Sequence, residues 1–261
     1  AGDTLTHTFY KEPWPICETR WFTFKGDVDT LWTASAGPIF KKHRVAPPAT
    51  KYFYSDAHPE VTSVDGRAYH DLWAGLPWLE LRAGPGTLFA DEGDNLFLII
   101  YGSRTANKWY MLNRNALLFN TSFIRVGRTI LDGKLRIFIS GVENADDWPG
   151  AKIALVASNP NSNIQLEAAD YQRIGSTLLS PDLAKITDHP FPDGYFTFNL
   201  NAAGLAAITQ GGITKLGLRE YYFDILGNEP EYHGYKRFGF MIHSADHADP
   251  ETWPRLEVTY K

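Results

Sequence analysis

Alternating apolar and polar residues dominate the chain from about residue 110 onward. The segment Lys134–Ser140 places Leu135, Ile137 and Ile139 on one face. The same period of two recurs in three further segments, at 195–200, 236–243 and 255–260. Because the side chains of a strand point alternately to its two faces, each segment predicts a strand with one buried and one solvated face. This pattern is typical of antiparallel sheets, so we expect an all-β chain.

Turn and helix signals are few. Asp132-Gly133 and Asp193-Gly194 predict turns directly before two of the strands. The segment 201–210 predicts one helix, which Asn199 or Asn201 caps and which the following glycines end. A second, short helix is expected at 166–173. Neither helix forms a strand-helix-strand unit, so a parallel nucleotide-binding sheet is not expected.

Five segments of the chain share a recognisable pattern, Asn113–Ser122, Ile130–Phe138, Phe196–Thr209, Gly212–Glu220 and Pro254–Tyr260. Together they resemble the DNRLRE-type β-sandwich family, which is related to carbohydrate-binding modules. Asn120 stands where that family usually has Asp. The resemblance covers roughly residues 61–261, with Val61–Gly66 as the first strand and turn. It implies a jelly-roll-like antiparallel β-sandwich, found in secreted surface proteins, polysaccharide-active enzymes and virion-associated proteins.

Residues 1–60 differ from the rest, because they are rich in Pro, Trp and charge. Strands are expected at 19–25 and 51–55, but prolines interrupt any long regular element. Two interpretations stay open. The segment is an extension that reaches a neighbouring subunit, for example by adding a strand to that subunit's sheet edge, or it supplies extra edge strands of the same domain. The first interpretation predicts a homo-oligomer or another assembly partner.

Composition narrows the function classes. Aromatic residues make up 14% of the 261 residues, enough for a sizeable core. The net charge is −5 and the longest basic run is Lys41–Arg44, so nucleic acid is not an expected partner. Cys17 is the only cysteine, which excludes an internal disulfide and a cysteine metal site. No stretch of about 18 apolar residues exists, so no membrane span is expected. The chain begins at Ala1, and any signal peptide is taken as already removed.

The segment Leu216–Asp224 carries an Arg-Glu pair inside an apolar strand. Arg219 and Glu220 are consecutive and therefore point to opposite faces. Glu220 shares its face with leucines, and a buried, unpaired carboxylate costs several kcal/mol. We therefore interpret Glu220 as a structural clamp that Arg114 partners, or as a residue near the sheet edge.

Three oxygen-rich segments and one His-containing loop are candidate metal sites. Calcium ligands are expected from Asp91–Asn95, Glu143–Asp147 or Asp224–Glu229, since Ca²⁺ prefers oxygen ligands. None has the Asp-x-Asp-x-Asp-Gly spacing, so a structural Ca²⁺ stays one option beside no cofactor at all. The polar loop after the strand at 236–243 is a second candidate site for a divalent metal ion, because it contains imidazoles and carboxylates. The candidate ligands are Asp224, Asn228, Glu229, His243, Asp246, His247 and Asp249.

Tryptophans beside Gly or Pro in loop-like sequence are candidate platforms for sugar rings. They are Trp73, Trp78, Trp109, Trp148 and Trp253. No catalytic residues are predicted, because no pair of acids stands out as a glycosidase pair and neither Gly102-Ser103 nor Gly175-Ser176 has the nucleophile-elbow pattern.

These observations favour a non-catalytic β-sandwich protein that acts in assembly and adhesion through glycan recognition. The resemblance implies an extracellular, cell-surface or virion location. The alternative is an accessory carbohydrate-binding module of a polysaccharide-degrading enzyme, and the third candidate is a glycan hydrolase or lyase.

Overall fold

The computed structural model describes residues 5–9, 20–24 and 47–261 in two compact units, Ala1–Ala46 and Pro47–Lys261. In the first unit, β1 (Leu5–Phe9) pairs antiparallel with β2 (Arg20–Phe24). The strand predicted at 19–25 is therefore present. The predicted subunit contact through residues 1–60 falls mainly on positions outside the described residues.

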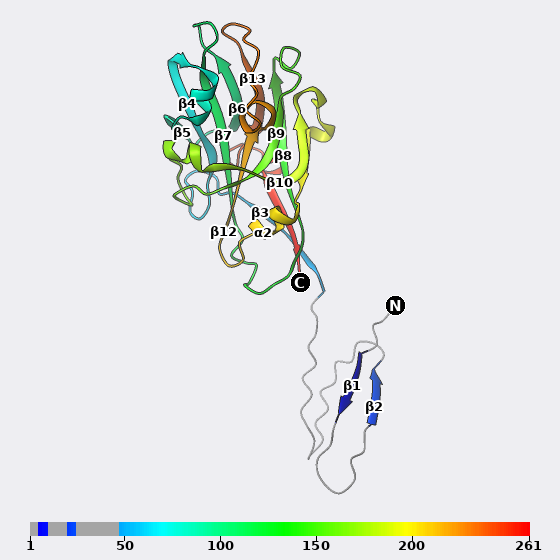
Figure 1. Cartoon of the computed structure of the whole chain (residues 1–261). Helices are drawn as coiled ribbons and strands as arrows, with labels where there is room; N and C mark the ends of the chain where they lie inside the picture. The colour runs from blue at the N-terminus through cyan, green and yellow to red at the C-terminus, as the bar shows by residue number, and fades with distance from the viewer. Residues whose placement is uncertain (1–4, 10–19, 25–46) are drawn as a thin grey trace. The chain divides into compact units, whose positions relative to one another are not determined.

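The second unit contains a single sheet of twelve strands (Figure 1). The strands are β3 (Ala49–Tyr54), β4 (Asp65–Leu76), β5 (Leu88–Ala90), β6 (Asn95–Gly102), β7 (Trp109–Asn120), β8 (Ile130–Glu143), β9 (Lys152–Ser158), β10 (Ile174–Lys185), β11 (Tyr195–Asn199), β12 (Ile213–Glu220), β13 (Arg237–His243) and β14 (Arg255–Tyr260). The helices are α1 (Trp78–Ala83), α2 (Ala202–Ala207), the 3-10 turns η1 (Ala168–Arg173), η2 (Ile186–Asp188), η3 (Pro192–Gly194) and η5 (Pro250–Thr252), and the π-helical turn η4 (Tyr221–Ile225). The predicted all-β class with short helices is confirmed.

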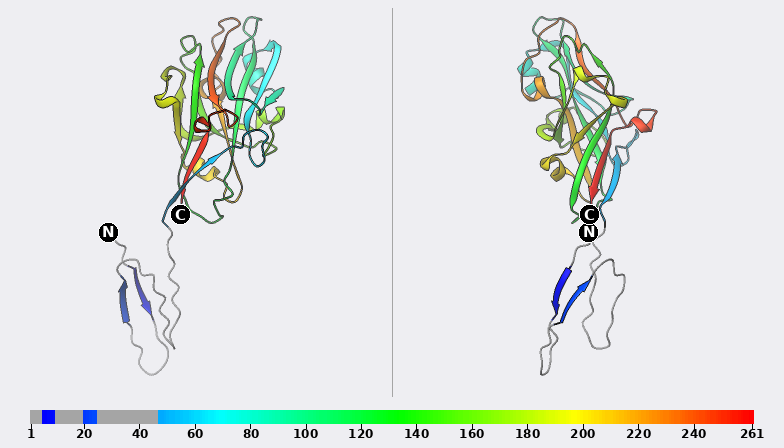
Figure 2. Two further views of the ribbon diagram at one scale, coloured as in Figure 1. Left: turned by 180° about the vertical axis from the view of Figure 1, so that it is seen from behind. Right: turned by 90° about the vertical axis from the view of Figure 1, so that its right-hand side faces the viewer.

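The main path through the sheet runs β10-β9-β12-β7-β6-β13-β8-β14-β3, and every pairing is antiparallel. Two long strands let the sheet curl (Figure 2). Strand β7 pairs with β6 near its start and with β12 near its end, and β4 lies along its other side. Strand β8 likewise changes partner, from β14 in its first half to β13 in its second. The jelly-roll strand arrangement that the resemblance implies remains a prediction.

The core is formed by the apolar faces that the alternation predicts. Leu135, Ile137 and Ile139 of β8 are buried, and so are Phe238 and Phe240 of β13. These side chains belong to one continuous apolar cluster. The period of two therefore identified which face of each strand is dry.

The large unit begins earlier than the predicted boundary at residue 61. Strand β3 pairs with β14 from Ala49 to Tyr54, so residues 47–60 belong to this unit. The favoured interpretation for this part of the chain is the extra edge strand. In addition, Val61–Gly66 is not a strand of its own, because β4 begins only at Asp65.

The predicted turn at Asp132-Gly133 is wrong. Both residues lie inside β8, opposite Thr259 and Val258 of β14. A strand that is hydrogen-bonded to its neighbour tolerates an Asp-Gly pair, because the lost ladder would cost more than the weak local preference for a turn. The turn at Asp193-Gly194 is present, with both residues at positive φ.

Both predicted helices are present. Helix α2 begins after Asn201, whose side chain accepts a hydrogen bond from the Gly204 amide at 2.9 Å. The segment predicted at 166–173 forms η1. Within the described residues no helix is long and apolar enough to cross a membrane.

Candidate functional site

The five candidate tryptophans fall into two groups. Trp73 is 66% exposed, and Trp253 is partly exposed. Trp78, Trp109 and Trp148 are almost completely buried, so their prediction as exposed sugar platforms is wrong.

The buried tryptophans have structural contacts that explain their burial. Trp78 begins α1 and packs edge-on against Trp109 of β7 with ring centroids 5.7 Å apart. Trp148 stacks on Phe238 at 4.3 Å, and its indole N–H donates to the Glu231 carbonyl at 2.9 Å. Only Trp148 of the three lies in a loop, whereas Trp78 begins α1 and Trp109 begins β7, so loop-like neighbours indicated neither the backbone structure nor an exposed ring.

Trp73 belongs to a four-ring surface, which we call the aromatic platform. Its members are Trp73 on β4, Tyr101 on β6, Tyr110 on β7 and Tyr235 in the loop before β13. Trp73 lies 5.4 Å from Tyr110 and 6.2 Å from Tyr235 between ring centroids. Tyr101 lies within 4.7 Å of both other tyrosines. Residues of three strands and one loop thus meet in one aromatic cluster.

Three of these rings are parallel but do not form a single column. The planes of Trp73, Tyr110 and Tyr235 are within 19° of parallel. Their centroid separations of 5.4, 6.2 and 5.9 Å form a nearly equilateral triangle. In a column of three rings, the outer pair would be about twice as far apart as each adjacent pair. The rings are therefore parallel and mutually offset, and Trp73 and Tyr235 present exposed faces whereas Tyr110 is buried.

A bulge in β4 places Trp73 on this surface. The pairing of β4 with β7 shifts register between Asp71 and Leu76, so the intervening residues leave the regular ladder. Gly75 has a φ of +67°, and a Cβ there would lie 2.5 Å from the Cβ of Ser103. Ser103 also donates to the Trp73 carbonyl at 3.4 Å. Glycine at 75 thus allows the close approach that fixes the bulge.

The platform combines a cation with neutral hydroxyl groups. The Arg104 guanidinium carbon lies 5.1 Å from the Tyr235 ring centroid and 5.8 Å from that of Trp73. Burial raises the pKa of Tyr110 and of Tyr101. A hydrogen bond from Tyr101 lowers the pKa of the exposed Tyr235. The surface therefore offers flat apolar faces, phenol hydroxyls and one guanidinium donor to a ligand.

The Arg-Glu strand ends in a buried ionic cluster. Arg114 donates to both oxygens of Asp224 at 2.9 and 2.8 Å, and Arg219 does the same at 2.7 Å for each. Asp224 has no exposed side-chain surface. Burial alone would raise its pKa, but the two guanidiniums hold the pKa below its ordinary value. The predicted partner of Arg114, Glu220, is therefore wrong, and Asp224 takes that place.

Glu220 is instead a backbone cap for η4. Its carboxylate accepts hydrogen bonds from the amides of Lys152 at 2.8 Å and Tyr222 at 3.0 Å, and from those of Phe223 and Asp224. Burial raises the pKa of Glu220 to about 7. Its role as a structural clamp stands, but the groups that it clamps are amides.

The candidate metal ligands do not converge. Both oxygens of Asp224 are occupied by arginines, and Asn228 and Glu229 are exposed. The rings of His243 and His247 stack at 3.6 Å, and both contact the Thr252 hydroxyl. Among the described residues no group of three or more His, Cys, Asp or Glu side chains is arranged to hold a metal ion. The remaining two candidate ligands, Asp246 and Asp249, accept hydrogen bonds from backbone amides.

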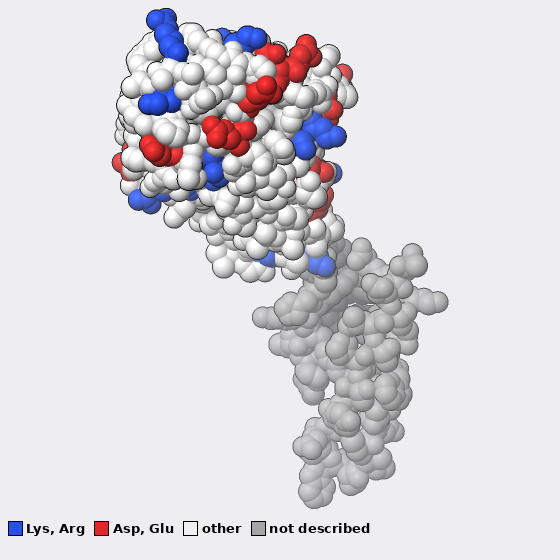
Figure 3. All heavy atoms as spheres, turned by 45° about the horizontal axis from the view of Figure 1, so that its top comes forward, with Lys and Arg blue, Asp and Glu red and all other residues white. Residues whose placement is uncertain are grey.

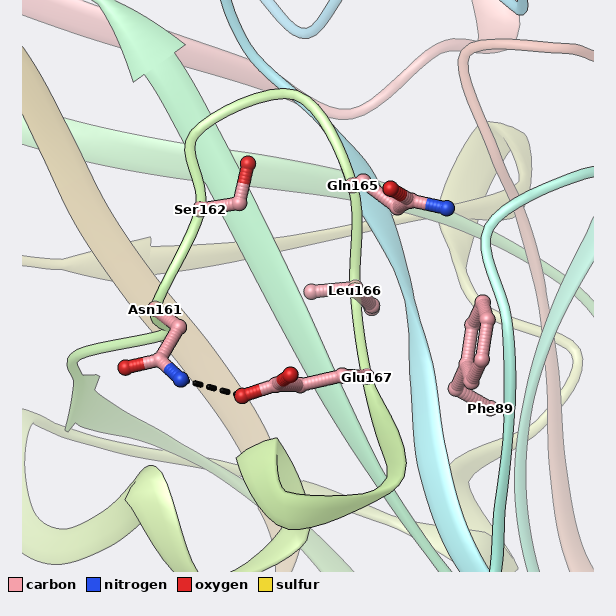
Figure 4. A pocket seen from close by; sticks show the side chains of 6 residues that line it. All are labelled: Phe89, Asn161, Ser162, Gln165, Leu166 and Glu167. Carbon is pink, nitrogen blue, oxygen red and sulfur yellow. Dashed lines mark hydrogen bonds between the residues drawn. The ribbon is translucent and has the colours of Figure 1, made fainter.

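A small hollow lies between the β5 strand and the loop before η1 (Figure 4). Its lining residues are Phe89, Asn161, Ser162, Gln165, Leu166 and Glu167. The Asn161 amide donates to Glu167, and Glu167 with Asp170 caps η1. These polar groups hold the loop, so the hollow carries no binding argument.

Charged side chains of both signs are interspersed over the face seen in Figure 3. This distribution differs from the clustered basic surface that phosphate backbones require. No protein-family model and no curated protein sequence matches this chain.

Proposed function

We propose that this chain is a non-catalytic surface protein, of a cell or of a virion, that recognises glycans and takes part in assembly. The observation that carries the proposal is the aromatic platform. Sugar rings present flat C–H faces, which pack well on exposed aromatic rings, and the surrounding hydroxyls need nearby donors and acceptors. Trp73 and Tyr235 supply the rings, and Arg104 with the tyrosine hydroxyls supplies the polar contacts.

The assembly part of the proposal is supported by the Pro-rich first 60 residues, whose composition differs from that of the rest of the chain. An extended arm adds a strand to a neighbour's sheet edge without a new hydrophobic core. Light scattering of the chain without residues 1–20 tests this part. The same oligomer with and without these residues would contradict it.

A glycan array with the full chain tests recognition. The wild type should retain at least one glycan class, and Trp73→Ala should weaken the retention about tenfold or more, equivalent to about 1.4 kcal/mol. Phe123→Ala is the matched control, because Phe123 is 61% exposed and lies outside the platform. Equal retention by wild type and Trp73→Ala would contradict the platform, and release of shortened glycan during incubation would contradict the non-catalytic assignment.

A further inference from the structure

A separate cleft opens where β3, β8, β14 and η5 meet, and it shares no residue with the aromatic platform. Its volume is about 580 Å³. The cleft is lined by Tyr54, Arg136, Tyr195, Pro250, Glu251, Trp253 and Arg255. Two arginines and three aromatic rings thus surround one opening.

The two arginines face each other across neighbouring strands. Arg136 of β8 and Arg255 of β14 are directly opposite in the antiparallel register, so both side chains leave the same face of the sheet. Like charges in this position repel each other. The pair therefore weakens the sheet locally unless an anion lies between the two side chains.

The protein supplies no such anion within residues 47–261. None of the ion pairs among these residues includes either arginine. The Nε atoms of both guanidiniums are buried and donate no hydrogen bond to a described residue. Glu251 lines the same cleft but is exposed and forms no ion pair with them. Both arginine side chains are nevertheless partly exposed and line the cleft, so the outer part of each guanidinium, and not its buried Nε, is available to a ligand.

The surrounding rings hold the guanidiniums in place. The guanidinium carbon of Arg136 lies 4.5 Å from the Tyr195 ring centroid, and that of Arg255 lies 5.1 Å from Tyr52. Both cations also act on the Tyr195 hydroxyl. Burial raises the pKa of this hydroxyl, and the two arginines partly offset that rise. Stacking of this kind orients a guanidinium plane and leaves its N–H edge available.

Two further lining residues present fixed aromatic rings, and one of them, Tyr54, is the cross-strand neighbour of Arg255. Tyr54 and Trp253 meet edge-to-face with centroids 6.5 Å apart. The Trp253 indole N–H donates to the His247 carbonyl at 2.6 Å, which holds the ring in position. The cleft therefore places an apolar ring surface beside two N–H donors that carry positive charge.

We propose that this cleft binds a sugar that carries a carboxylate, with Arg136 and Arg255 contacting the carboxylate and Trp253 and Tyr54 packing against the ring. A planar guanidinium matches a carboxylate through paired hydrogen bonds. Glu251, the acidic residue that lines the cleft, weakens binding of the carboxylate by electrostatic repulsion. This site does not depend on the aromatic platform.

Isothermal titration calorimetry of the full chain tests the proposal with two ligands that differ only at C6, methyl glucuronide with a carboxylate and methyl glucoside with a hydroxymethyl group. The glucuronide should bind about tenfold or more tightly than the glucoside, because charge-assisted bonds are about twice as strong as neutral ones. Arg136→Gln and Arg255→Gln should each remove most of this difference. Arg125→Gln is the matched control for net charge, because Arg125 is exposed and does not line the cleft.

Two further variants separate binding from folding. Glu251→Gln should tighten glucuronide binding severalfold, because it removes a negative charge from the cleft. Arg136→Lys keeps the charge but loses the paired donors, so it should bind more weakly than wild type and more tightly than Arg136→Gln. If circular dichroism shows that an Arg→Gln variant does not fold, the glucuronide affinities of Glu251→Gln and Arg136→Lys test the proposal instead.

Three outcomes would overturn the proposal. The first is equal affinity for glucuronide and glucoside. The second is unchanged affinity in both arginine variants when they are folded. The third is inorganic sulfate binding as tightly as the glucuronide, which would show a bare anion site without a sugar preference. Trp73→Ala should leave the glucuronide affinity unchanged, and a loss of array retention in that variant alone would concern only the platform.

Discussion

Arg219 and Asp224, five residues apart, form a buried ion pair with two hydrogen bonds of 2.7 Å each. The π-helical turn η4 directly after β12 brings the carboxylate back toward the strand that carries the arginine. Arg114 of β7 adds two further bonds to the same carboxylate. One acid thus ties two neighbouring strands to the turn that follows them.

We expect Asp224→Asn to lower the free energy of unfolding by about 3–5 kcal/mol, because two buried guanidiniums lose their counter-charge. Urea denaturation measures this change. Asp132→Asn is the control, since Asp132 is 52% exposed on its side chain and lies 3.7 Å from Lys134. An exposed pair of this kind contributes about 0–1 kcal/mol. A loss below about 1 kcal/mol for Asp224→Asn would contradict the importance of the cluster.

Because the pKa of Asp65 is raised, we expect the free energy of unfolding to fall as the pH rises. Burial raises its pKa from the ordinary 3.8 to about 7, and the nearby Asp246 and Glu60 act in the same direction. Between about pH 4 and pH 7 the folded state therefore keeps a proton that the unfolded state has released. From pH 5 to pH 8 this group should lower the free energy of unfolding by about 2–3 kcal/mol.

Asp65→Asn tests the sign of this effect, because the side-chain amide of Asn does not ionise. In the wild type the Ala245 backbone N–H donates to the Asp65 carboxylate at 3.0 Å, and the Asn oxygen can still accept this bond. Urea denaturation at pH 5 and pH 8 should show a smaller difference for the variant than for the wild type. Part of the difference should remain, because the pKa of Glu220 is also raised to about 7. An identical pH difference in both proteins would refute the assignment to Asp65.

We expect the addition of one methyl group at Gly239 to lower the stability of the fold strongly. Its φ is +140°, and a Cβ there would collide with the Leu98 carbonyl of β6. Gly239→Ala should therefore destabilise the protein by about 3 kcal/mol or more, from backbone strain and overpacking together. Gly127→Ala should cost about 1 kcal/mol, because its φ is +90° but no atom lies near the new methyl group. Similar thermal unfolding of both variants would show that the contact to Leu98 adjusts freely.

Substitution of Trp78 should lower the stability much more than substitution of Trp73. Trp78→Ala removes a buried ring and should cost about 3–5 kcal/mol. Trp73→Ala removes an exposed ring that stacks on neighbours, so about 1 kcal/mol is expected. Differential scanning fluorimetry gives the two melting temperatures. Comparable losses would mean that Trp73 is a structural residue and would weaken the glycan proposal.

The strands were predictable because apolar residues at a period of two report burial directly, as Phe238 and Phe240 show. The exposure of the tryptophans was not, because it depends on which segments cover a ring. Trp148, for example, is covered by Phe238, which lies ninety residues later in the chain.

The contact partners of the buried and cleft side chains could not be predicted without the register of the strands. Arg114 was expected beside Glu220, yet η4 turns Asp224 toward both arginines and leaves Glu220 to the backbone amides. The opposition of Arg136 and Arg255 depends on the β8–β14 pairing, for which the sequence contains no local signal.

The pairing of β3 with β14 joins two segments that are synthesised far apart in time. The hydroxyls of Thr50 and Thr259 lie 2.8 Å apart although 209 residues separate them. At a synthesis rate of about 5–20 residues per second, β3 leaves the ribosome roughly 10–40 seconds before its partner exists. During that interval the backbone groups of β3 that later bond to β14 have no partner strand.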